Sequence, residues 1–182
     1  MCILRWCIAS LFLMMLACQT KPKQEKETAV TTGTIQEDSI LALATRPGPD
    51  APRSAADRLV RALYFEHSTK DNPLRETKDR SLIDQFFAKS TADLIWNDTQ
   101  KSSGKVNRSK INLLFKAPDT AVKKTWVEPA AIGGSKSVVY VTFLNNNKPG
   151  DIRVELSQIA ENRWRITEMI YPDSTRLTEL LK

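Results

Sequence analysis

Apolar positions between residues 53 and 101 recur at the spacing of amphipathic helices. In the stretch SAADRLVRALYFEHS the apolar side chains fall on one helical face, and Ser54 and Asp57 stand at the spacing of a capping box. The face consists of Leu59, Val60, Leu63 and Tyr64, and His67 continues it one turn further on. Asn72-Pro73 ends this helix, because the residue before a proline avoids helical backbone angles.

Two shorter helices are predicted next. A second apolar stripe of helical period consists of Leu82, Ile83, Phe86 and Phe87. Ser90 and Asp93 repeat the capping spacing ahead of a third helix. This third helix contains Leu94, Ile95 and Trp96, and Gly104 follows its last turn. Each of the three helices is apolar on one side only, so each needs a surface to pack against.

After residue 120 the period changes from that of helices to that of strands. Four segments are rich in β-branched and aromatic residues: 121–132, 137–144, 151–159 and 163–171. Pro129 is expected to end or bulge the first strand, and Asn145 to Gly150 to turn the second strand into the third. Helices followed by a four-stranded antiparallel meander predict an α+β domain, with the helices packed on one face of the sheet.

The turn between the third and fourth strands determines which side chains share a face. A two-residue loop would set Leu156 opposite Thr167 and mix the two faces, whereas a three-residue loop at Ala160–Asn162 keeps them consistent. In that loop Asn162 takes the left-handed conformation. The register then pairs Leu156 with Ile166, Val154 with Glu168 and Ile152 with Ile170. Glu168 is therefore predicted to look inward, on the face of Trp164, Ile166 and Ile170.

The amino-terminal segment carries an export signal. Ile8–Ala17 is almost wholly apolar but has half of the roughly twenty residues that a membrane-spanning helix needs, which is typical of a signal peptide. Its end, Met15–Cys18, resembles the lipobox of bacterial lipoproteins. That resemblance implies that residues 1–17 are removed and that Cys18 is acylated and holds the chain in a membrane. Gln19, in place of the aspartate that retains such proteins at the inner membrane, implies the outer membrane, facing the periplasm.

The cysteine count is consistent with acylation. Cys2 and Cys7 lie in the segment to be removed, so the mature chain has one cysteine and can form no intrachain disulfide. A lipid thioether explains this odd cysteine in an exported chain, and two or more acyl chains bind a membrane stably. An ordinary signal peptide followed by an unmodified Cys18 is the alternative.

Behind the cysteine, residues 18–52 are expected to form a flexible tether. Gln19–Pro52 contains no aromatic residue and few large apolar ones, so it cannot bury enough surface to order itself. The apolar stretch Ser39–Ala44 is the exception, and whether it forms a helical turn or docks on the domain stays open. Residues 53–182, about 130 in number, are predicted to form a single α+β domain with one core.

The charge distribution of the chain argues against one class of partner, nucleic acid. The formal net charge is +6, and the stretch from Lys101 to Lys124 has seven basic residues against Asp119 alone. Nucleic-acid binding would fit such a patch, but the stretch lacks interleaved aromatic residues for stacking bases, and a lipid-anchored periplasmic protein would rarely meet nucleic acid. We interpret the stretch as a solvated loop. Contact with anionic lipid or a cell-wall polymer is the lesser alternative.

Three stretches carry a resemblance that bears on the fold. SLIDQFFAKSTADLIW, VYVTFLNNNKPGDIRVEL and WRITEMIYPDSTRLTELL resemble bacterial lipoproteins of the nuclear-transport-factor-two-like superfamily, with its cystatin-like cone fold, and in particular its domains of unknown function. The resemblance covers Ala55–Leu181. It implies a curved sheet wrapped around the first helix, a pocket inside this cone and a short C-terminal helix. Such domains have a more acidic stretch before the first strand; here LLFKAPDTAV retains only Asp119.

Few residues suggest catalysis, and no catalytic set, metal site or cofactor is predicted. His67 is the only histidine, and phosphate-cradling and dinucleotide-binding glycine motifs are missing from the sequence. One enzyme hypothesis uses the implied pocket: cone-fold isomerases and dehydratases place a carboxylate base beside a hydrogen-bonding acid. Glu168 would be the base, with Tyr64 or His67 as partner. Alternatively Glu168 pairs with an arginine or lies at the rim, and His67 closes its helix.

The leading functional hypothesis is therefore a non-catalytic lipoprotein. Its pocket or sheet face would bind a small ligand, a cell-wall component or an envelope protein. The ligand-binding candidates are Glu168, Tyr64, His67 and Trp126, although Tyr64 and Trp126 also fit core or rim positions. An outer strip of Val138, Tyr140 and Leu144 could pair two protomers. An immunity protein against a toxin is a further alternative.

Overall fold

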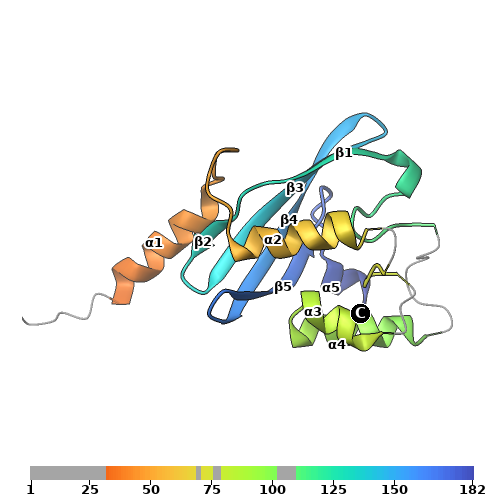
Figure 1. Ribbon diagram of the computed structural model, residues 1–182, viewed down its shortest axis with the longest axis horizontal. Coiled ribbons are helices and arrows are strands. Elements are labelled where there is room, and N and C mark those ends of the chain that lie inside the picture. The colour runs from red at the N-terminus through yellow and green to blue at the C-terminus, as the bar shows by residue number, and fades with distance from the viewer. Residues whose placement is uncertain (1–31, 69–70, 76–78, 102–109) are drawn as a thin grey trace, which may run out of the picture. The chain divides into compact units, whose positions relative to one another are not determined.

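A computed structural model of the chain describes residues 32–68, 71–75, 79–101 and 110–182 (Figure 1). The chain divides into two units, Met1–Thr31 and Thr32–Lys182, and the described residues belong to the second. The predicted signal peptide, Cys18 and the first part of the predicted tether lie outside the described residues. The second unit confirms the predicted α+β class, with helices on an antiparallel sheet and a short helix at the carboxyl end.

The predicted first helix begins with its capping box, but its second half is π-helical rather than α-helical. The described helices are α1 (Thr32–Ala44), α2 (Ala55–Arg61), the π-helical turn η1 (Ala62–Glu66), α3 (Arg80–Phe86), α4 (Lys89–Thr99), the 3₁₀ turn η2 (Asp119–Ala121) and α5 (Leu177–Leu180). At the start of α2, Ser54 N–H donates to Asp57 Oδ1 at 2.6 Å, and Asp57 N–H donates to Ser54 Oγ at 3.3 Å. The π-helical turn η1 ends with His67 N–H donating to the Ala62 carbonyl at 3.2 Å.

Helix α4 forms where predicted, but it starts differently. Its N-cap is Ala88, without a side-chain hydrogen bond, so the predicted capping by Ser90 is wrong. Asp93 instead pairs with Arg80 at 2.5 Å and Lys89 at 3.0 Å. The N–H of Ala88 donates to the carbonyl of Ile166 in β5 at 2.8 Å. A tertiary hydrogen bond to the sheet thus decides where α4 begins.

The sheet has the predicted strands in the order of a meander. The strands are β1 (Val122–Val127), β2 (Ala131–Gly133), β3 (Lys136–Asn145), β4 (Lys148–Ala160) and β5 (Arg163–Ile170). They pair antiparallel in the order β1-β3-β4-β5, and β2 also pairs with β3. Pro129 lies between β1 and β2, which confirms that it interrupts the first predicted strand.

The turn between β3 and β4 is shorter than predicted. Asn146 and Asn147 have φ angles of 49° and 65°, so they form a two-residue turn with both residues left-handed. Lys148–Gly150 therefore belongs to β4 and pairs with the end of β3, Gly150 opposite Phe143. The predicted turn from Asn145 to Gly150 was too long because asparagine tolerates the left-handed region well enough to close the hairpin alone.

The predicted register of β4 and β5 is correct at one end and wrong at the other. Leu156 pairs with Ile166 as predicted, and Asn162 has a φ of 54°. The loop has two residues, however, and bulges lie between Gln158 and Ala160 and between Glu155 and Leu156. Beyond the second bulge Val154 pairs with Met169 and Glu155 with Glu168. Met169 therefore takes the core position that the prediction assigned to Glu168.

The space between the helices and the sheet is filled by apolar side chains. Helix α2 lies across the sheet, and α3 and α4 lie beside β5 (Figure 1). Residues 112–117, here called the apolar loop, insert into this space: Leu113 and Leu114 are fully buried and Phe115 nearly so. The resemblance implied a pocket inside a cone, but the side chains of the apolar loop occupy part of the interior, in one cluster with those of α2 and the sheet.

Hydrogen bonds hold the apolar loop in place. Asn112 N–H donates to the Ala117 carbonyl at 2.9 Å, and Asn112 Oδ1 accepts the N–H of Leu114 at 2.9 Å. Its Nδ2 donates to Asp119 at 2.8 Å, and Asp119 also pairs with Arg75. Partial burial acts to raise the pKa of Asp119, but these hydrogen bonds outweigh it and lower that pKa. The one acidic residue of this stretch thus anchors a loop.

Residues assigned to the tether by sequence include a helix. Helix α1 packs on β2, and a Cβ at Gly133 would lie 2.3 Å from the Ser39 carbonyl oxygen and 2.9 Å from Leu43 Cγ. Behind α1, the guanidinium of Arg46 lies 3.9 Å from the centre of the Tyr140 ring. The stretch that includes Ser39–Ala44 is thus helical and docked, which resolves the question that the sequence left open.

Candidate functional site

Glu168 is a hydrogen-bonded structural carboxylate. Its side chain is buried, and its Oε2 accepts the Thr178 hydroxyl at 2.5 Å. Its Oε1 accepts the N–H groups of Thr178 at 3.2 Å and Met169 at 3.0 Å, and Arg176 Nη1 lies 3.9 Å from Oε2. These bonds join the end of β5 to α5. A carboxylate occupied in this way is poorly placed to take a proton from a substrate.

Tyr64 lies in η1 and His67 directly follows it, and both side chains pack against the core. The Tyr64 hydroxyl donates to the Leu114 carbonyl at 2.7 Å, so it holds the apolar loop. Burial, and secondarily the neighbouring Tyr171, raises the pKa of the Tyr64 phenol well above its ordinary value. The His67 ring packs edge-on against Phe86 with centroids 5.0 Å apart. Its Nδ1 is buried and has no hydrogen-bond partner among the described residues.

Trp126 lies on β1 and is 46% exposed. The guanidinium of Arg53 lies 5.3 Å from its ring centre, which is within the range of a cation–π contact. Among the described residues, no hydrogen bond or ion pair joins Glu168 to Tyr64, His67 or Trp126. Each of the four predicted site residues therefore makes its contacts separately from the other three. That any of them binds a ligand stays a prediction.

Replacing Glu168 by alanine is expected to lower the free energy of unfolding by about 1–3 kcal/mol, because it removes the acceptor of the buried Met169 N–H and of two half-buried donors of Thr178. Glu168→Gln keeps an acceptor oxygen and is expected to lose less. Urea unfolding followed by circular dichroism measures both. Equal stability of the alanine variant and the wild type would show that these hydrogen bonds contribute nothing.

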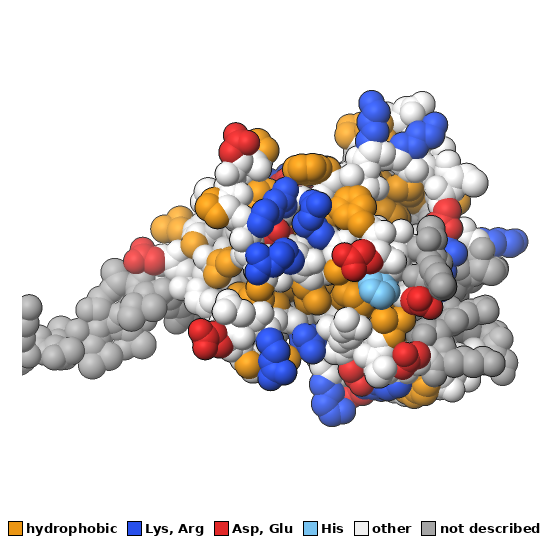
Figure 2. Space-filling model, viewed as in Figure 1, with side chains coloured by type: hydrophobic (Ala, Val, Ile, Leu, Met, Phe, Trp, Pro, Cys, Tyr) orange, Lys and Arg blue, Asp and Glu red, His pale blue; other side chains and the backbone are white. Residues whose placement is uncertain are grey.

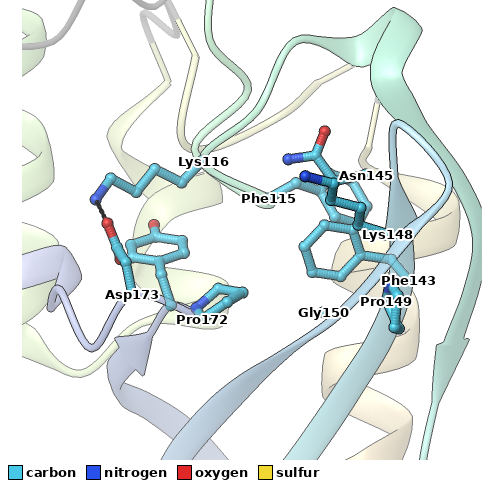
Figure 3. Close-up of a pocket in the computed structure, with 10 residues that line it drawn as sticks. Phe115, Lys116, Phe143, Asn145, Lys148, Pro149, Gly150, Pro172 and Asp173 are labelled. Carbon is cyan, nitrogen blue, oxygen red and sulfur yellow. Dashed lines mark hydrogen bonds and ion pairs between the residues drawn. The ribbon is translucent and has the colours of Figure 1, made fainter.

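A cavity of about 280 Å³ lies where three segments meet, and we call it the hairpin cavity. The segments are the apolar loop, the β3–β4 hairpin and the turn between β5 and α5. The lining residues are Phe115, Lys116, Phe143, Asn145, Lys148, Pro149, Gly150, Tyr171, Pro172 and Asp173. In Figure 3, Lys116, Pro172 and Asp173 stand on one side, opposite Phe143, Asn145, Lys148 and Pro149.

The polar groups of the hairpin cavity differ in what they contact. Lys116 Nζ donates to Asp173 Oδ2 at 2.5 Å and to Thr175 Oγ1 at 2.8 Å. The hydrogen bond from Lys116 lowers the pKa of Asp173, so that carboxyl is ionised at neutral pH. Lys148 is exposed and has no ion pair within the described part of the chain. Asn145 Oδ1 is buried and lacks a hydrogen-bond partner there.

Two further hollows lie beyond the hairpin cavity, and both are lined by Arg46. One, of about 460 Å³, shares Phe143, Pro149 and Gly150 with the hairpin cavity. The other, of about 230 Å³, includes Trp126. Arg46 is engaged by Glu128 at 2.9 Å and Asp151 at 3.0 Å. Since its charge is already paired, these hollows offer a ligand less than the hairpin cavity does.

The outer strip predicted to pair protomers is partly covered within the chain. Val138 is buried, and Arg46 lies over Tyr140. Leu144 lines the larger of the two hollows. Pairing of two protomers through this strip stays a prediction.

Basic side chains also gather outside the basic stretch noted in the sequence. Figure 2 shows Lys and Arg side chains over α2, which carries Arg58 and Arg61. Of the basic stretch from Lys101 to Lys124, residues 102–109 lie outside the described residues. Lys123 and Lys124 at its end are exposed, but they lie in β1, and Leu113 and Leu114 within the stretch are fully buried. The interpretation of the whole stretch as a solvated loop is therefore wrong for its second half.

Sequence reasoning missed the hairpin cavity, although two signals were present. The turn residues NNNKPG place a lysine and a proline directly after a tight turn, and the apolar triplet in LLFKAP is unusual for a loop. Neither signal shows that Lys116 and Lys148 line the same cavity. That juxtaposition follows from tertiary packing.

No protein-family model, curated protein or solved structure matches the chain. Within the described ranges, no group of three or more histidine, cysteine or acidic side chains is arranged to hold a metal ion. None of the described helices is both long enough and apolar enough to span a bilayer. The function must therefore be argued from this chain's own residues.

Proposed function

We propose that this chain is a lipid-anchored, non-catalytic binding protein of the bacterial envelope. Acylation at Cys18 would hold it in the membrane, with the compact unit facing the periplasm. The sequence Met15–Cys18 and the single cysteine left after cleavage support the anchor. The resemblance of three stretches of the sequence to bacterial lipoproteins with a cone-like domain supports the same class of protein.

The proposed binding role is supported mainly by the way apolar side chains fill the interior of the domain. Leu113 and Leu114 fill space that a cone-fold enzyme would use for its substrate, and Glu168 is bound to α5 rather than to a free site. The surface still offers the hairpin cavity, with apolar walls and with Lys148, which has no ion pair among the described residues. A filled interior with a cavity at its edge supports binding better than it supports isomerase or dehydratase chemistry.

Intact-protein mass spectrometry and membrane fractionation test the anchor. The expressed chain is expected to lack residues 1–17, to carry acyl chains on Cys18 and to sediment with membranes. Cys18→Ser is expected to lose the acyl mass and to leave the membrane fraction, because the acyl chains are the proposed anchor. Cys7→Ser is the matched control and is expected to behave as the wild type. An unmodified Cys18 in the membrane-bound protein would disprove the anchor.

A further inference from the structure

We propose that the hairpin cavity binds a small molecule that combines an apolar ring with one acidic group. This inference rests on the binding role proposed above and adds the chemical class of the ligand. It depends on three properties of the described residues: the rings that wall the cavity, the charge left unpaired at its mouth and the size of the space.

The walls suit a ring. Phe115, Phe143 and Tyr171 line the cavity with side chains 7%, 4% and 2% exposed, so their positions are set by the core. The rings of Phe115 and Phe143 lie 5.3 Å apart at an angle of 60°. The Tyr171 hydroxyl donates to the Leu113 carbonyl at 2.6 Å, so Tyr171 meets the cavity with its ring, and Lys116 Nζ lies 5.8 Å from the centre of that ring. Aromatic walls of this kind favour a flat or cyclic apolar group.

The charged side chains of the hairpin cavity favour a ligand with a single acidic group. Lys116 and Asp173 pair with each other at 2.5 Å and so cancel within the cavity wall. Lys148 remains, exposed and without an ion pair in the described part of the chain. An ammonium group of this kind pairs readily with a carboxylate or phosphate. One unpaired cation at the mouth therefore calls for one acidic group on the ligand.

The Asn145 amide lines the same wall as Lys148. Its Oδ1 is buried and has no hydrogen-bond partner among the described residues. Since a half-turn of the amide exchanges oxygen and nitrogen, Asn145 can offer the ligand either an acceptor or a donor. It can therefore bond a polar substituent close to the acidic group.

The size limits the ligand further. A cavity of about 280 Å³ is just below the range of about 300–1,000 Å³ typical of ligand pockets. A Cβ at Gly150 would lie 3.2 Å from Pro172 and 3.4 Å from Phe143, so the space between these side chains is already tight. The cavity is therefore large enough for one substituted ring and too small for several units of a polymer.

The test uses 4-hydroxybenzoate as the acidic probe and 4-hydroxybenzamide as its neutral counterpart. The full chain is placed in lipid nanodiscs, and binding is measured by isothermal titration calorimetry against empty nanodiscs. The acid is expected to bind saturably at one site, and the amide about tenfold more weakly or less, because it lacks the charge that pairs with Lys148. Equal affinities, or no saturable binding of the acid, would overturn the proposal.

Two variants locate the site. Lys148→Ala is expected to weaken binding of the acid about tenfold, because it removes the unpaired cation. Lys136→Ala is its matched control: this lysine is also exposed, but it lies at the other end of β3. Gly150→Ala narrows the cavity and is expected to weaken the binding of both probes. Lys148 is solvent-exposed, so its replacement should leave urea unfolding unchanged. Equal binding of the acid by Lys148→Ala and Lys136→Ala would overturn the assignment of the ligand site to the hairpin cavity.

This inference and the proposed function can fail separately. If the ring acids do not bind while Cys18 carries its lipid and the protein stays in the membrane fraction, the ligand class is wrong and the anchored protein stands. If Cys18 is unmodified but the acid binds through Lys148, the proposed ligand site is supported and the proposed lipid anchor is disproved. The calorimetric measurement and the mass spectrum thus report on different parts of the chain.

Discussion

Replacing Leu113 by alanine is expected to lower the free energy of unfolding by about 2–5 kcal/mol. Leu113 is fully buried, and it belongs to the apolar loop that fills the interior between α2 and the sheet. The loop is fastened on several sides, so it cannot easily collapse into the space that the smaller side chain leaves. Tyr64 holds its neighbour Leu114, and Tyr171 bonds the Leu113 carbonyl itself. The lost burial and the remaining cavity both contribute to the cost.

Urea unfolding measures this effect, and the chain offers a matched control. Leu41 is 65% exposed on α1, so Leu41→Ala removes the same atoms without opening a cavity. Alanine is also at least as good a helix former as leucine, and the control should change stability by less than about 0.5 kcal/mol. Similar losses in the two variants would show that the apolar loop does not fill the interior as described.

Replacing Gly133 by alanine is expected to detach α1 and to cost about 1–3 kcal/mol. A Cβ at this position would lie 2.3 Å from the Ser39 carbonyl oxygen, a backbone atom that cannot rotate away. Helix α1 has 13 residues, which is marginal for an isolated helix in water. Once pushed off β2 it should therefore unfold rather than persist alone. Hydrogen exchange of the α1 amides measures this directly, with a large loss of protection expected.

Gly48→Ala is the matched control for this experiment. A Cβ at Gly48 would meet nothing within 4 Å, so the same chemical change should leave both exchange and stability almost unaltered. Full protection of α1 in Gly133→Ala would contradict the described packing.

The strand pattern of the carboxyl half could be predicted because its information is local. Alternating and β-branched residues specify β3, β4 and β5 without reference to the rest of the chain. The capping box of Ser54 and Asp57 is likewise a matter of a few neighbouring residues, and the structure confirms it. Features that depend on one stretch of sequence were therefore predicted well.

The register of β4 and β5 could be predicted only as far as the bulge between Glu155 and Leu156. Counting residues from the turn gave the pair of Leu156 and Ile166 correctly, but no local signal marks the bulge beyond it. Thr167 lies at this irregularity, and its carbonyl accepts the Thr91 hydroxyl of α4 at 2.7 Å. Contacts from a helix more than seventy residues away thus accompany the change that moves Glu168 out of the predicted position.

The site shows the same division. Glu168, Tyr64 and His67 attracted attention because their residue types suggest chemistry, yet the structure gives each a nearby bond or ring contact that occupies it. Lys148 attracted none, because an exposed lysine beside a turn is ordinary in any sequence. Its interest arises from the rings that packing brings beside it.

By itself, the sequence determined the α+β class, most of the elements and the motif that predicts a lipid anchor at Cys18. These follow from hydrophobic period, turn residues and short motifs, all of which act over a few residues. Only the tertiary structure decided that α1 docks, that the apolar loop fills the interior and that Lys148, without an ion pair in the described ranges, lines the hairpin cavity. The physical reason is that burial and charge pairing depend on which distant segments meet, and those contacts are long-range.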